Sequence, residues 1–426
     1  QVINTKRMKL KSYPKYKDSG VQWIGEIPED WKIRKIKDNL RFEIGGTPAT
    51  GKEEYYDGDN LWVSIADMKN NPLIIETKSM ISKEGIINSN VKKIPKGSLL
   101  FSFKLSVGYV SFSNVDLYTN EAIASFLQNK KINLNFLKYI LKQDFEENGF
   151  ENIYGAKLFN KDLIGFAKHV VPETYKEQTT IATFLDKKTQ KINQTIKKDK
   201  KLIELLKEKR IALINHVVTK GLDKNAKMKE SGIDWIGEIP EGWEVKKLKF
   251  IAKIKTGDKN TEDHLPDGKY PFFVRSQTIE RLNTYTFNCE AVLTAGDGVG
   301  VGKVFHHYVG KFDAHQRVYV ITNFKELLGK YIFYYLKNNL IKEMLKYNAK
   351  STVDSLRLPM FLNFSMTYPK RNEEQTKIVN HLDYHTKKIN QTIKKIQEKI
   401  TLMEEYKKSL INHVVTGKVD VRGVVV

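Results

Sequence analysis

The stretch EQTTIATFLDKKTQKINQTIKK begins at Glu177, and EQTKIVNHLDYHTKKINQTIKK begins at Glu374, a displacement of 374 minus 177, or 197 residues. Both copies go on to end in LINHVVT. A second matching pair lies upstream of them, with SGVQWIGEIPE from Ser19 and SGIDWIGEIPE from Ser231, a displacement of 231 minus 19, or 212 residues. Matched segments therefore bracket two dissimilar inserts. We expect the two copies of each repeated segment to have the same structural role, and the two inserts to have related functions on different targets.

The EQT segments have the apolar spacing of long helices with a narrow heptad seam. Each helix is expected to run about 40 residues, from Glu177 to His216 or from Glu374 to His413, with Gly221 and Gly417 as stop signals just beyond. The predicted seam residues are Leu185, Ile192, Ile196, Ile203, Leu206 and Leu213 in the first copy and Leu382, Ile389, Ile393, Ile396, Ile400, Met403 and Leu410 in the second.

A long helix with a narrow apolar stripe needs a partner. The economical partner is the other copy in the same chain, and pairing between chains is the alternative. Because a globular insert returns the chain between the helices, we expect them to pair antiparallel and to relate the repeats by a pseudo-twofold axis. One seam position of the first copy is polar: Asp199 replaces the apolar residue found at Ile396. Asp199 either sets the register of the pair or faces solvent at a frayed seam.

Both inserts have mixed helix and strand patterns. In the first, strands are expected at 60–65, 98–103 and 108–112 and a helix at 135–147. In the second, strands are expected at 270–274, 303–305 and 318–322 and a helix at 327–347. Short strings also correspond, such as GYV at Gly108 with GKV at Gly302 and YGAK at Tyr154 with YNAK at Tyr347. The two inserts are therefore predicted to share one α/β fold of the α+β kind.

The composition indicates a folded protein with a polyanionic partner. A net charge of +22 and a pI of about 9.5 fit DNA, RNA or an anionic membrane surface. No apolar run approaches the roughly 20 residues of a membrane helix, so we expect a cytoplasmic protein. Cys289 is the only cysteine, which excludes an intrachain disulfide and a cysteine-rich zinc site.

Strings that suggest an enzyme are incomplete. GTPATGK, from Gly46, has phosphate-loop spacing, but Glu53 follows where a magnesium-binding Ser or Thr is needed. The glycines from Gly296 to Gly302 fit a flexible loop near a ligand backbone or a hairpin connection. His306 and His307 lack a carboxylate at metal-ligand spacing. Methyltransferase and nuclease strings are also missing, so no catalytic residue and no metal ligand is predicted.

Polar and basic residues at loop-like positions are better candidates for function, because such side chains can bond base edges or hold phosphates. Each is individually more often a plain surface residue. They gain weight as a set because they occupy corresponding places in two otherwise different inserts. The candidates are Lys104, Tyr109, Asn120, Tyr154 and Lys157 in the first insert and Arg275, Gln277, Lys303, His315, Gln316, Arg317, Lys350 and Ser351 in the second.

With these segments the chain resembles the specificity subunit of type I restriction-modification systems. The resemblance is carried by WIGEIPE before Trp31 and before Trp243, by GGTP from Gly45, and by the twice-used EQ..I...LD...KINQTIKK helix. In this order the motifs cover almost the whole chain. One departure is that GGTP has no close copy in KTGDK, residues 255–259, so the early loops of the two inserts are not assumed to be equivalent.

The resemblance implies two globular target recognition domains joined by an intramolecular antiparallel coiled coil. The expected boundaries are residues 1–176 and 221–373 for these domains, 177–220 and 374–417 for the conserved helices, and 418–426 for a C-terminal tail. Each domain would recognise one half of a bipartite asymmetric DNA site, and the coil would act as a ruler. The family's partners are double-stranded DNA, two copies of a modification (methyltransferase) subunit, and restriction subunits with motor and nuclease activity.

The resemblance also implies that this chain is noncatalytic and needs no cofactor, because S-adenosylmethionine is expected on the partner methyltransferase. No membrane partner is expected. Two alternatives stay open: a basic coiled-coil scaffold whose globular parts bind proteins, and a self-sufficient nuclease or methyltransferase. The scaffold predicts little DNA sequence preference. The enzyme would cleave or methylate DNA alone.

Overall fold

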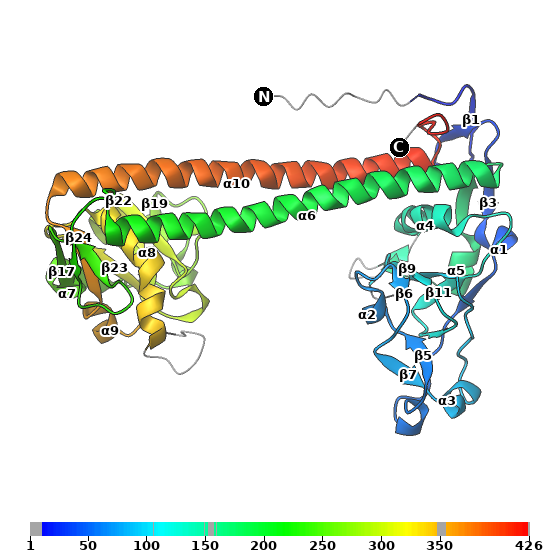
Figure 1. The fold of residues 1–426 in the computed structure, drawn as a ribbon, viewed down its shortest axis with the longest axis horizontal. Helices are drawn as coiled ribbons and strands as arrows, with labels where there is room; N and C mark the ends of the chain where they lie inside the picture. The colour runs from blue at the N-terminus through cyan, green and yellow to red at the C-terminus, as the bar shows by residue number, and fades with distance from the viewer. Residues whose placement is uncertain are drawn as a thin grey trace. The chain divides into compact units, whose positions relative to one another are not determined.

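The computed structural model describes residues 11–104, 106–148, 150–151, 157–158, 160–346 and 355–424 (Figure 1). The chain divides into two compact units. The first contains Gln1–Lys197 and Ile400–Val426, and the second contains Lys198–Lys399. The long helices α6 (Tyr175–Lys220) and α10 (Asn372–Val415) each contribute one part to each unit. Within the described residues, no helix has the length and apolar character needed to cross a membrane.

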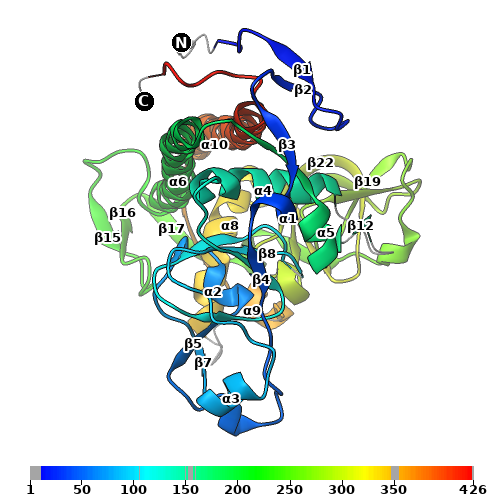
Figure 2. The same ribbon diagram turned by 90° about the vertical axis from the view of Figure 1, so that its right-hand side faces the viewer.

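Short strands and short helices make up the insert of the first unit and the segments around it. The elements in chain order are β1 (Tyr16–Asp18), β2 (Glu26–Pro28), β3 (Lys32–Lys35), α1 (Ile36–Asn39), β4 (Phe42–Ile44), η1 (Glu53–Tyr55), β5 (Asn60–Val63), α2 (Ile65–Met68), β6 (Leu73–Ile74), β7 (Ser79–Ile81), α3 (Lys83–Ile87), β8 (Leu99–Ser102), β9 (Val110–Ser113), β10 (Tyr118–Thr119), β11 (Ile123–Phe126), α4 (Leu134–Asn148), β12 (Phe150–Glu151), β13 (Lys157–Leu158), α5 (Lys161–Phe166) and β14 (Lys168–Val171). In Figure 2, β5, β7 and α3 form a lobe that projects from the rest of this insert.

The second unit has the same plan with longer strands. Its elements are β15 (Met228–Glu230), β16 (Glu238–Pro240), β17 (Trp243–Lys247), α7 (Leu248–Ile251), β18 (Lys253–Thr256), η2 (Thr261–Asp263), β19 (Tyr270–Phe273), β20 (Ile279–Leu282), β21 (Phe287–Ala295), η3 (Gly298–Gly300), β22 (Phe305–Ala314), β23 (Val318–Thr322), α8 (Gly329–Lys346), α9 (Leu358–Leu362) and β24 (Ser365–Pro369).

Sheet topology confirms that the inserts share one fold. The first has a sheet of order β4-β11-β8-β9-β6 and a second of order β10-β5-β7, while the second insert has one sheet of order β18-β23-β21-β22-β19-β20. The parallel pair β10–β5 corresponds to the parallel pair β22–β19. The long strand β22 therefore does the work of both β9 and β10, and it joins what are two sheets in the first insert.

Most elements expected from the sequence are present. Strands β5, β8, β9, β19 and β23 and helices α4 and α8 lie where the patterns place them. The strand expected at 303–305 is wrong: residues 301–303 are a turn, and β22 begins at Phe305. The sequence analysis also missed β21 and β11. All four residues of β11 are buried, so β11 shows no alternation of polar and apolar residues, whereas residues 287–291 of β21 do alternate and carry a strand signal.

The two long helices are longer than expected, with 46 residues in α6 and 44 in α10. Both begin two residues before the EQ pair. Gly221 (φ 76°) and Gly417 (φ 73°) follow the last helical turns in the left-handed conformation. They are confirmed as stop signals, because a left-handed residue satisfies the terminal carbonyl groups at little steric cost in glycine.

Each unit contains a two-helix segment in which α6 and α10 run in opposite directions. In the first unit, Lys407 Nζ donates to Asn193 Oδ1 at 3.0 Å. In the second unit, Arg210 Nη1 donates to Asn390 Oδ1 at 2.5 Å. The partner residue numbers fall along α10 (407 to 390) while they rise along α6 (193 to 210). The helices therefore pair antiparallel within one chain, as predicted. All thirteen predicted seam side chains are buried or half-buried.

Asp199 is enclosed rather than solvated. The residue is 9% exposed, and Lys399 Nζ lies 2.8 Å from its carboxylate. The interpretation that Asp199 faces solvent at a frayed seam is therefore wrong. A mostly enclosed charge with one partner penalises any shift that separates the pair, which favours a role in setting the register of α6 and α10.

The glutamine of each EQ pair joins the start of a long helix to the preceding loops. Gln178 accepts a hydrogen bond from Asn133 N (2.8 Å) and donates to Pro172 O (3.2 Å). Gln375 accepts from Leu328 N (2.9 Å) and donates to Pro369 O (3.0 Å). Both glutamines are buried, so each must be fully hydrogen-bonded to be tolerated there.

The aspartate of each LD pair anchors a helix of the insert to the long helix. The hydroxyl of Tyr139 in α4 donates to Asp186 Oδ1 at 2.6 Å, and the hydroxyl of Tyr334 in α8 donates to Asp383 Oδ1 at 2.6 Å. Burial and these hydrogen bonds raise the pKa of both tyrosines. The motif EQ..I...LD is thus a set of attachment points between the helices and the two inserts.

The glutamate of each EQ pair receives the indole of the second tryptophan in each repeat. Trp31 Nε1 donates to Glu177 Oε1 at 3.2 Å, and Trp243 Nε1 donates to Glu374 Oε1 at 2.9 Å. Both tryptophans are 1% exposed. The tryptophan that follows each WIGEIPE block is therefore a structural seat for the start of a long helix.

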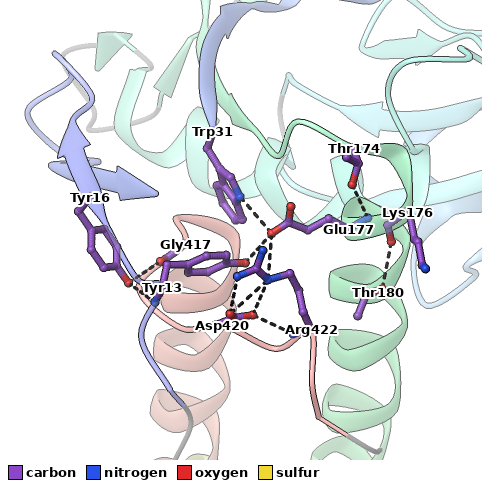
Figure 3. Close-up of polar contacts among 10 residues, drawn as sticks. All are labelled: Tyr13, Tyr16, Trp31, Thr174, Lys176, Glu177, Thr180, Gly417, Asp420 and Arg422. Carbon is purple, nitrogen blue, oxygen red and sulfur yellow. Dashed lines mark hydrogen bonds and ion pairs between the residues drawn. The ribbon is translucent and has the colours of Figure 1, made fainter. Parts of the chain in front are cut away.

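In the first unit this seat includes the C-terminal segment (Figure 3). Arg422 pairs with Asp420 at 2.7 Å and lies 3.9 Å from the Glu177 carboxylate, to which Tyr13 also donates at 2.8 Å. Tyr16 donates to the carbonyl group of Gly417 at 3.1 Å. Residues from both ends of the described chain thus pack at the start of α6.

His169 gives the first unit a predicted sensitivity to acid. The side chain is fully buried in β14, and within the described part of the chain neither ring nitrogen has a hydrogen-bond partner. Burial lowers its pKa to about 4. In the unfolded chain a histidine binds its proton near a pH of about 6.5. The folded state therefore loses stability as the pH falls from about 6.5 towards 4, by about 2 kcal/mol at pH 5.

The second repeat supplies the control for this prediction. In β14, His169 lies opposite Arg34, and in β24 the buried Met366 lies opposite Lys246. Because Arg34 and Lys246 are displaced by 212 residues, Met366 occupies the position in the second repeat that His169 has in the first. We expect amide hydrogen exchange in β14, measured by mass spectrometry, to accelerate in the wild-type chain between pH 7 and pH 5, after correction for the intrinsic pH dependence of exchange. In His169→Met the extra acceleration should vanish. Equal acceleration in both proteins would assign the effect to another group.

Candidate nucleic-acid interface

Gly45 and Gly257 are displaced by 212 residues, and each lies where the backbone of one loop passes very close to the backbone of another. We call this close approach the crossing, and it occurs in both inserts. A Cβ on Gly45 would lie 2.1 Å from the Thr119 carbonyl oxygen, and a Cβ on Gly257 would lie 1.8 Å from that of Ala314. Neither position can hold a side chain without displacing backbone. The sequence offered no ground to treat the loops GGTP and KTGDK as equivalent, and the structure shows that their glycines make the same close approach to backbone.

The loops that cross these glycines carry the candidates Asn120 and His315 at corresponding positions. Asn120 N donates to Val63 O at 2.9 Å, and His315 N donates to Phe273 O at 2.9 Å, in each case on the strand that pairs in parallel. Asn120 Oδ1 accepts from Ala122 N at 3.1 Å, and His315 Nδ1 accepts from Arg317 N at 3.0 Å. Both side chains thus hold the loops in which they lie.

His315 is better suited to positioning than to contact with a ligand. Only 4% of the residue is exposed. Burial, with the charges of Arg275 and Arg317, lowers its pKa, so the ring is neutral near pH 7. A neutral Nδ1 can accept the backbone bond from Arg317, and this fixes where the Arg317 side chain leaves the loop.

Arg275, Arg317 and Asp297 form a charged group on the second insert. Arg275 Nη1 lies 2.9 Å from Asp297 Oδ1, and Arg317 Nη1 lies 2.8 Å from Asp297 Oδ2. The arginine side chains are 40% and 56% exposed, against 27% for the aspartate. A guanidinium has five N–H donors, and each ion pair uses one. Asp297, which the sequence analysis missed, therefore orients two arginines whose remaining donors can bind a ligand.

A pocket of about 370 Å³ opens beside this group. Its walls combine hydrogen-bonding groups with apolar surface, so it suits a partner that offers both polar and apolar contacts. The lining residues are Thr261, Val274, Arg275, Ser276, Glu280, Asp297, Gly298, Val299 and Gly300.

The remaining candidates of the second insert flank the same region. Gln277 Nε2 donates to the carbonyl oxygen of Lys303 at 3.0 Å, and Gln316 Nε2 donates to Asn260 Oδ1 at 2.5 Å. Gln277, Lys303 and Gln316 are exposed. Lys350 and Ser351 lie outside the described residues. The glycine-rich segment around Gly298 connects β21 to β22, which confirms the hairpin interpretation.

In the first insert the structure gathers fewer candidates. Lys104 is exposed in the connection between β8 and β9, which corresponds to the β21–β22 connection, and its Nζ lies 5.5 Å from the centre of the Phe103 ring. Tyr109 is half-buried against the core that contains Val63, so its ring serves packing. Lys157 lies in β13, with a side chain outside the description, and Tyr154 lies outside the described residues.

The structure supports no phosphate loop at GTPATGK. Lys52 Nζ donates to the Tyr55 hydroxyl at 3.1 Å, and the segment leads into the three-residue helix η1 rather than a long helix. His307 contacts Glu290 at 2.8 Å across the strands, a partner that the sequence did not reveal. Among the described residues, no group of three or more His, Cys, Asp or Glu side chains is placed to hold a metal ion.

The arrangement of repeated helices, matched tryptophan seats and paired inserts agrees with known proteins. A family model described as "Type I restriction modification DNA specificity domain" matches residues 28–205 and 240–402. The chain belongs to this type I specificity family. As a specificity subunit of a type I restriction-modification system, it recognises DNA sequence.

Two relatives of the subunit match it over most of their own length. It is 26% identical over 354 residues to the MjaIX specificity subunit of Methanocaldococcus jannaschii, covering 77% of this chain and 80% of the relative. It is 26% identical over 425 residues to the MjaVIII specificity subunit of the same organism, covering 93% of this chain and 94% of the relative.

Two solved structures have a similar fold. One comes from a study of "complex assembly and conformational transition of the type I R-M system", with a TM-score of 0.72 at 13% identity, covering 92% of the subunit and 99% of that chain. The other is the HsdS subunit from Thermoanaerobacter tengcongensis, with a TM-score of 0.54 at 12% identity, covering 92% and 98%.

Proposed function

We propose that this subunit recognises a bipartite asymmetric DNA site, one half through each insert, and directs adenine methyltransferase and restriction subunits to that site. Residues 1–176 and 221–373 are the target recognition domains of this proposal. The chain itself is noncatalytic and holds no cofactor. The observation that carries the proposal is the duplicated crossing at Gly45 and Gly257, which presents different side chains from one backbone geometry.

The side chains on the crossing loops suit different bases. Next to Asn120, whose side chain holds its loop, the first insert carries Glu121, and next to His315 the second insert carries Gln316 and Arg317. Gln pairs with adenine, Arg with guanine, and Glu accepts from cytosine in the major groove. Two unlike loops on one fold therefore predict an asymmetric site. A net charge of +22 supplies the phosphate contacts that carry no sequence information.

Linking two modest DNA readers raises affinity only when both half-sites can be occupied together. The antiparallel helix pair supports this part of the proposal, because a paired helix is a stiffer linker than a loop. The separation of the half-sites then becomes part of the recognised sequence. Asp199 and Lys399 contribute by opposing slippage between the helices that would change that separation.

The partner subunits in this proposal meet equivalent surfaces. Leu205 on α6 and Leu402 on α10 are displaced by 197 residues, and they are 49% and 64% exposed. Exposed leucines at matching positions of both copies suit two identical partners better than one. We assign these surfaces to two modification subunits, which carry S-adenosylmethionine, with restriction subunits joining the complex. Adenine methylation requires base extrusion, so the complex also distorts the duplex.

Methylation mapping tests the proposed function. The subunit is expressed with its modification subunit in a host that lacks type I systems, and N6-methyladenine is mapped by single-molecule sequencing. We expect methylation at one bipartite motif, and none when the subunit is omitted. Exchanging residues 41–167 for the insert of another family member should change one half of the motif, and exchanging residues 253–364 should change the other half.

The two competing functions predict other results. A protein-binding scaffold would leave the motif unchanged by either exchange, which would overturn the proposal. A self-sufficient enzyme would methylate or cleave DNA when purified without any partner, which would refute the noncatalytic role alone.

A further inference from the structure

An exposed apolar side chain, Val299, lies near the charged group formed by Arg275, Asp297 and Arg317. Val299 lies in the connection between β21 and β22 and is 91% exposed. The nearby valines of the same connection are buried, with Val301 at 3% and Val304 at 6%. The connection therefore buries two valines and exposes the third to solvent, in the pocket that Arg275 and Asp297 also line.

The connection is held in place rather than loose. A Cβ on Gly300 would lie 2.5 Å from the Arg275 carbonyl oxygen, and a Cβ on Gly302 (φ 67°) would lie 2.3 Å from Ile341 Cδ1. Gly296 N donates to Arg317 O at 2.8 Å, and Gly296 O accepts from Leu356 N at 2.7 Å. These contacts fix the base of the hairpin. Val299 is therefore exposed on an ordered segment, which would lose little conformational entropy on binding a ligand.

The position of Val299 suits a base edge. It lines the 370 Å³ pocket together with Arg275 and Asp297. The connection that carries Val299 joins two neighbouring strands of the six-stranded sheet, Phe287–Ala295 and Phe305–Ala314. Side chains on such a loop can contact base edges in the major groove of B-DNA. In that groove the thymine C5-methyl group is the apolar feature among the donors and acceptors. A short branched side chain matches a methyl group, whereas wedges that separate base steps are usually longer.

We propose that Val299 contacts the C5-methyl group of a thymine in the half-site bound by the second insert, and so determines specificity at that base pair. The inference rests on the proposed function and adds the chemical group that one residue recognises. The arginines beside it, oriented by Asp297, bond the neighbouring base edges. A solitary exposed valine would otherwise need no explanation, and its place among oriented donors on a rigid hairpin is what indicates a partner.

Deoxyuridine provides the test, because it removes the thymine methyl group and leaves every hydrogen-bonding atom. Once the motif has been mapped, duplexes are made with one thymine of the second half-site replaced by deoxyuridine at a time. The dissociation constant of the complex with its modification subunits is then measured on each duplex. Losing contact with one buried methyl group should weaken wild-type binding about fourfold at one position.

Three variants separate the contact from general effects. Val299→Ala should bind the thymine duplex about fourfold more weakly and should lose the penalty for deoxyuridine at that position. Val299→Thr keeps a methyl group and should keep most of the penalty. Val309→Ala makes the same change at a 65% exposed site on β22, and it should behave as wild type. Circular dichroism melting confirms that each variant is folded.

The outcomes distinguish this inference from the proposed function. A wild-type complex that methylates a bipartite motif yet is indifferent to every deoxyuridine overturns the role of Val299 and leaves the function standing. The role is equally overturned by a second half-site without thymine on either strand, or by a Val299→Ala complex with an undiminished penalty. Absence of a motif dependent on this chain would defeat both.

Discussion

Replacing both Arg275 and Arg317 with alanine is expected to weaken binding of the complex to its DNA site about 30-fold or more, because each well-oriented arginine pair with a base is worth about 1–3 kcal/mol. The single variants should each lose about 5- to 150-fold. Asp297 holds both guanidinium groups at 2.9 and 2.8 Å, so their orientation is set before DNA arrives. That arrangement lowers the entropic cost of binding and makes the loss on truncation large.

Methylome mapping and salt dependence measure the nature of this loss. Removal of a base contact should relax the motif at one position of the second half-site and leave the first half-site unchanged. Arg281→Ala is the matched control, since it removes the same charge from the same insert, and its guanidinium is bonded to backbone oxygens of Gly268 and Lys269. A uniform loss of affinity for all DNA sequences would show that these arginines bind phosphates instead. The dependence of the binding constant on salt concentration would then have a slope smaller by about 1 for each arginine removed.

Replacing Trp243 with alanine is expected to destabilise the second unit by about 4 kcal/mol, because a fully buried indole leaves a large cavity. Trp243 is 1% exposed and packs near Gly221, where α6 ends, while its Nε1 donates to Glu374 at the start of α10. One side chain therefore joins the end of one long helix to the beginning of the next. Hydrogen exchange of β17 and β24 in the full-length chain measures the loss.

Phenylalanine variants separate the hydrogen bond from the packing. Trp243→Phe should cost about 2 kcal/mol, since Glu374 keeps its charge and loses its indole donor. Trp31→Phe should cost less, because Tyr13 and Arg422 still contact the Glu177 carboxylate (Figure 3). Equal costs for the two phenylalanine variants would contradict the role given to the C-terminal segment at the start of α6.

The long helices were predictable from the sequence because heptad spacing is a local property. Leu185, Leu382 and the other seam residues repeat at fixed intervals, and Gly221 and Gly417 end the helices through a backbone preference that is local too. The duplication likewise showed that two inserts share a plan. Strand β11 escaped prediction because a strand buried on both faces lacks the alternation that identifies strands.

The role of Asp199 could be decided only by the tertiary structure, because both interpretations of the sequence had the same local pattern. What separates them is the ammonium group of Lys399 at 2.8 Å, and no local rule brings two residues 200 positions apart together. The same limit applies to His315, a DNA-binding candidate at a loop-like position that is only 4% exposed.

The sequence alone determined the repeated architecture, the two long helices, the family resemblance and the two arginines as candidates, because these depend on residue type and spacing. The tertiary structure decided that Asp297 orients those arginines, that Gly45 and Gly257 share one crossing, and that Val299 stands exposed while Val301 is buried. Each of these depends on which distant backbone atoms lie within a few ångströms. That proximity follows from the packing of the whole insert, and it cannot be read from the spacing of residues along the chain.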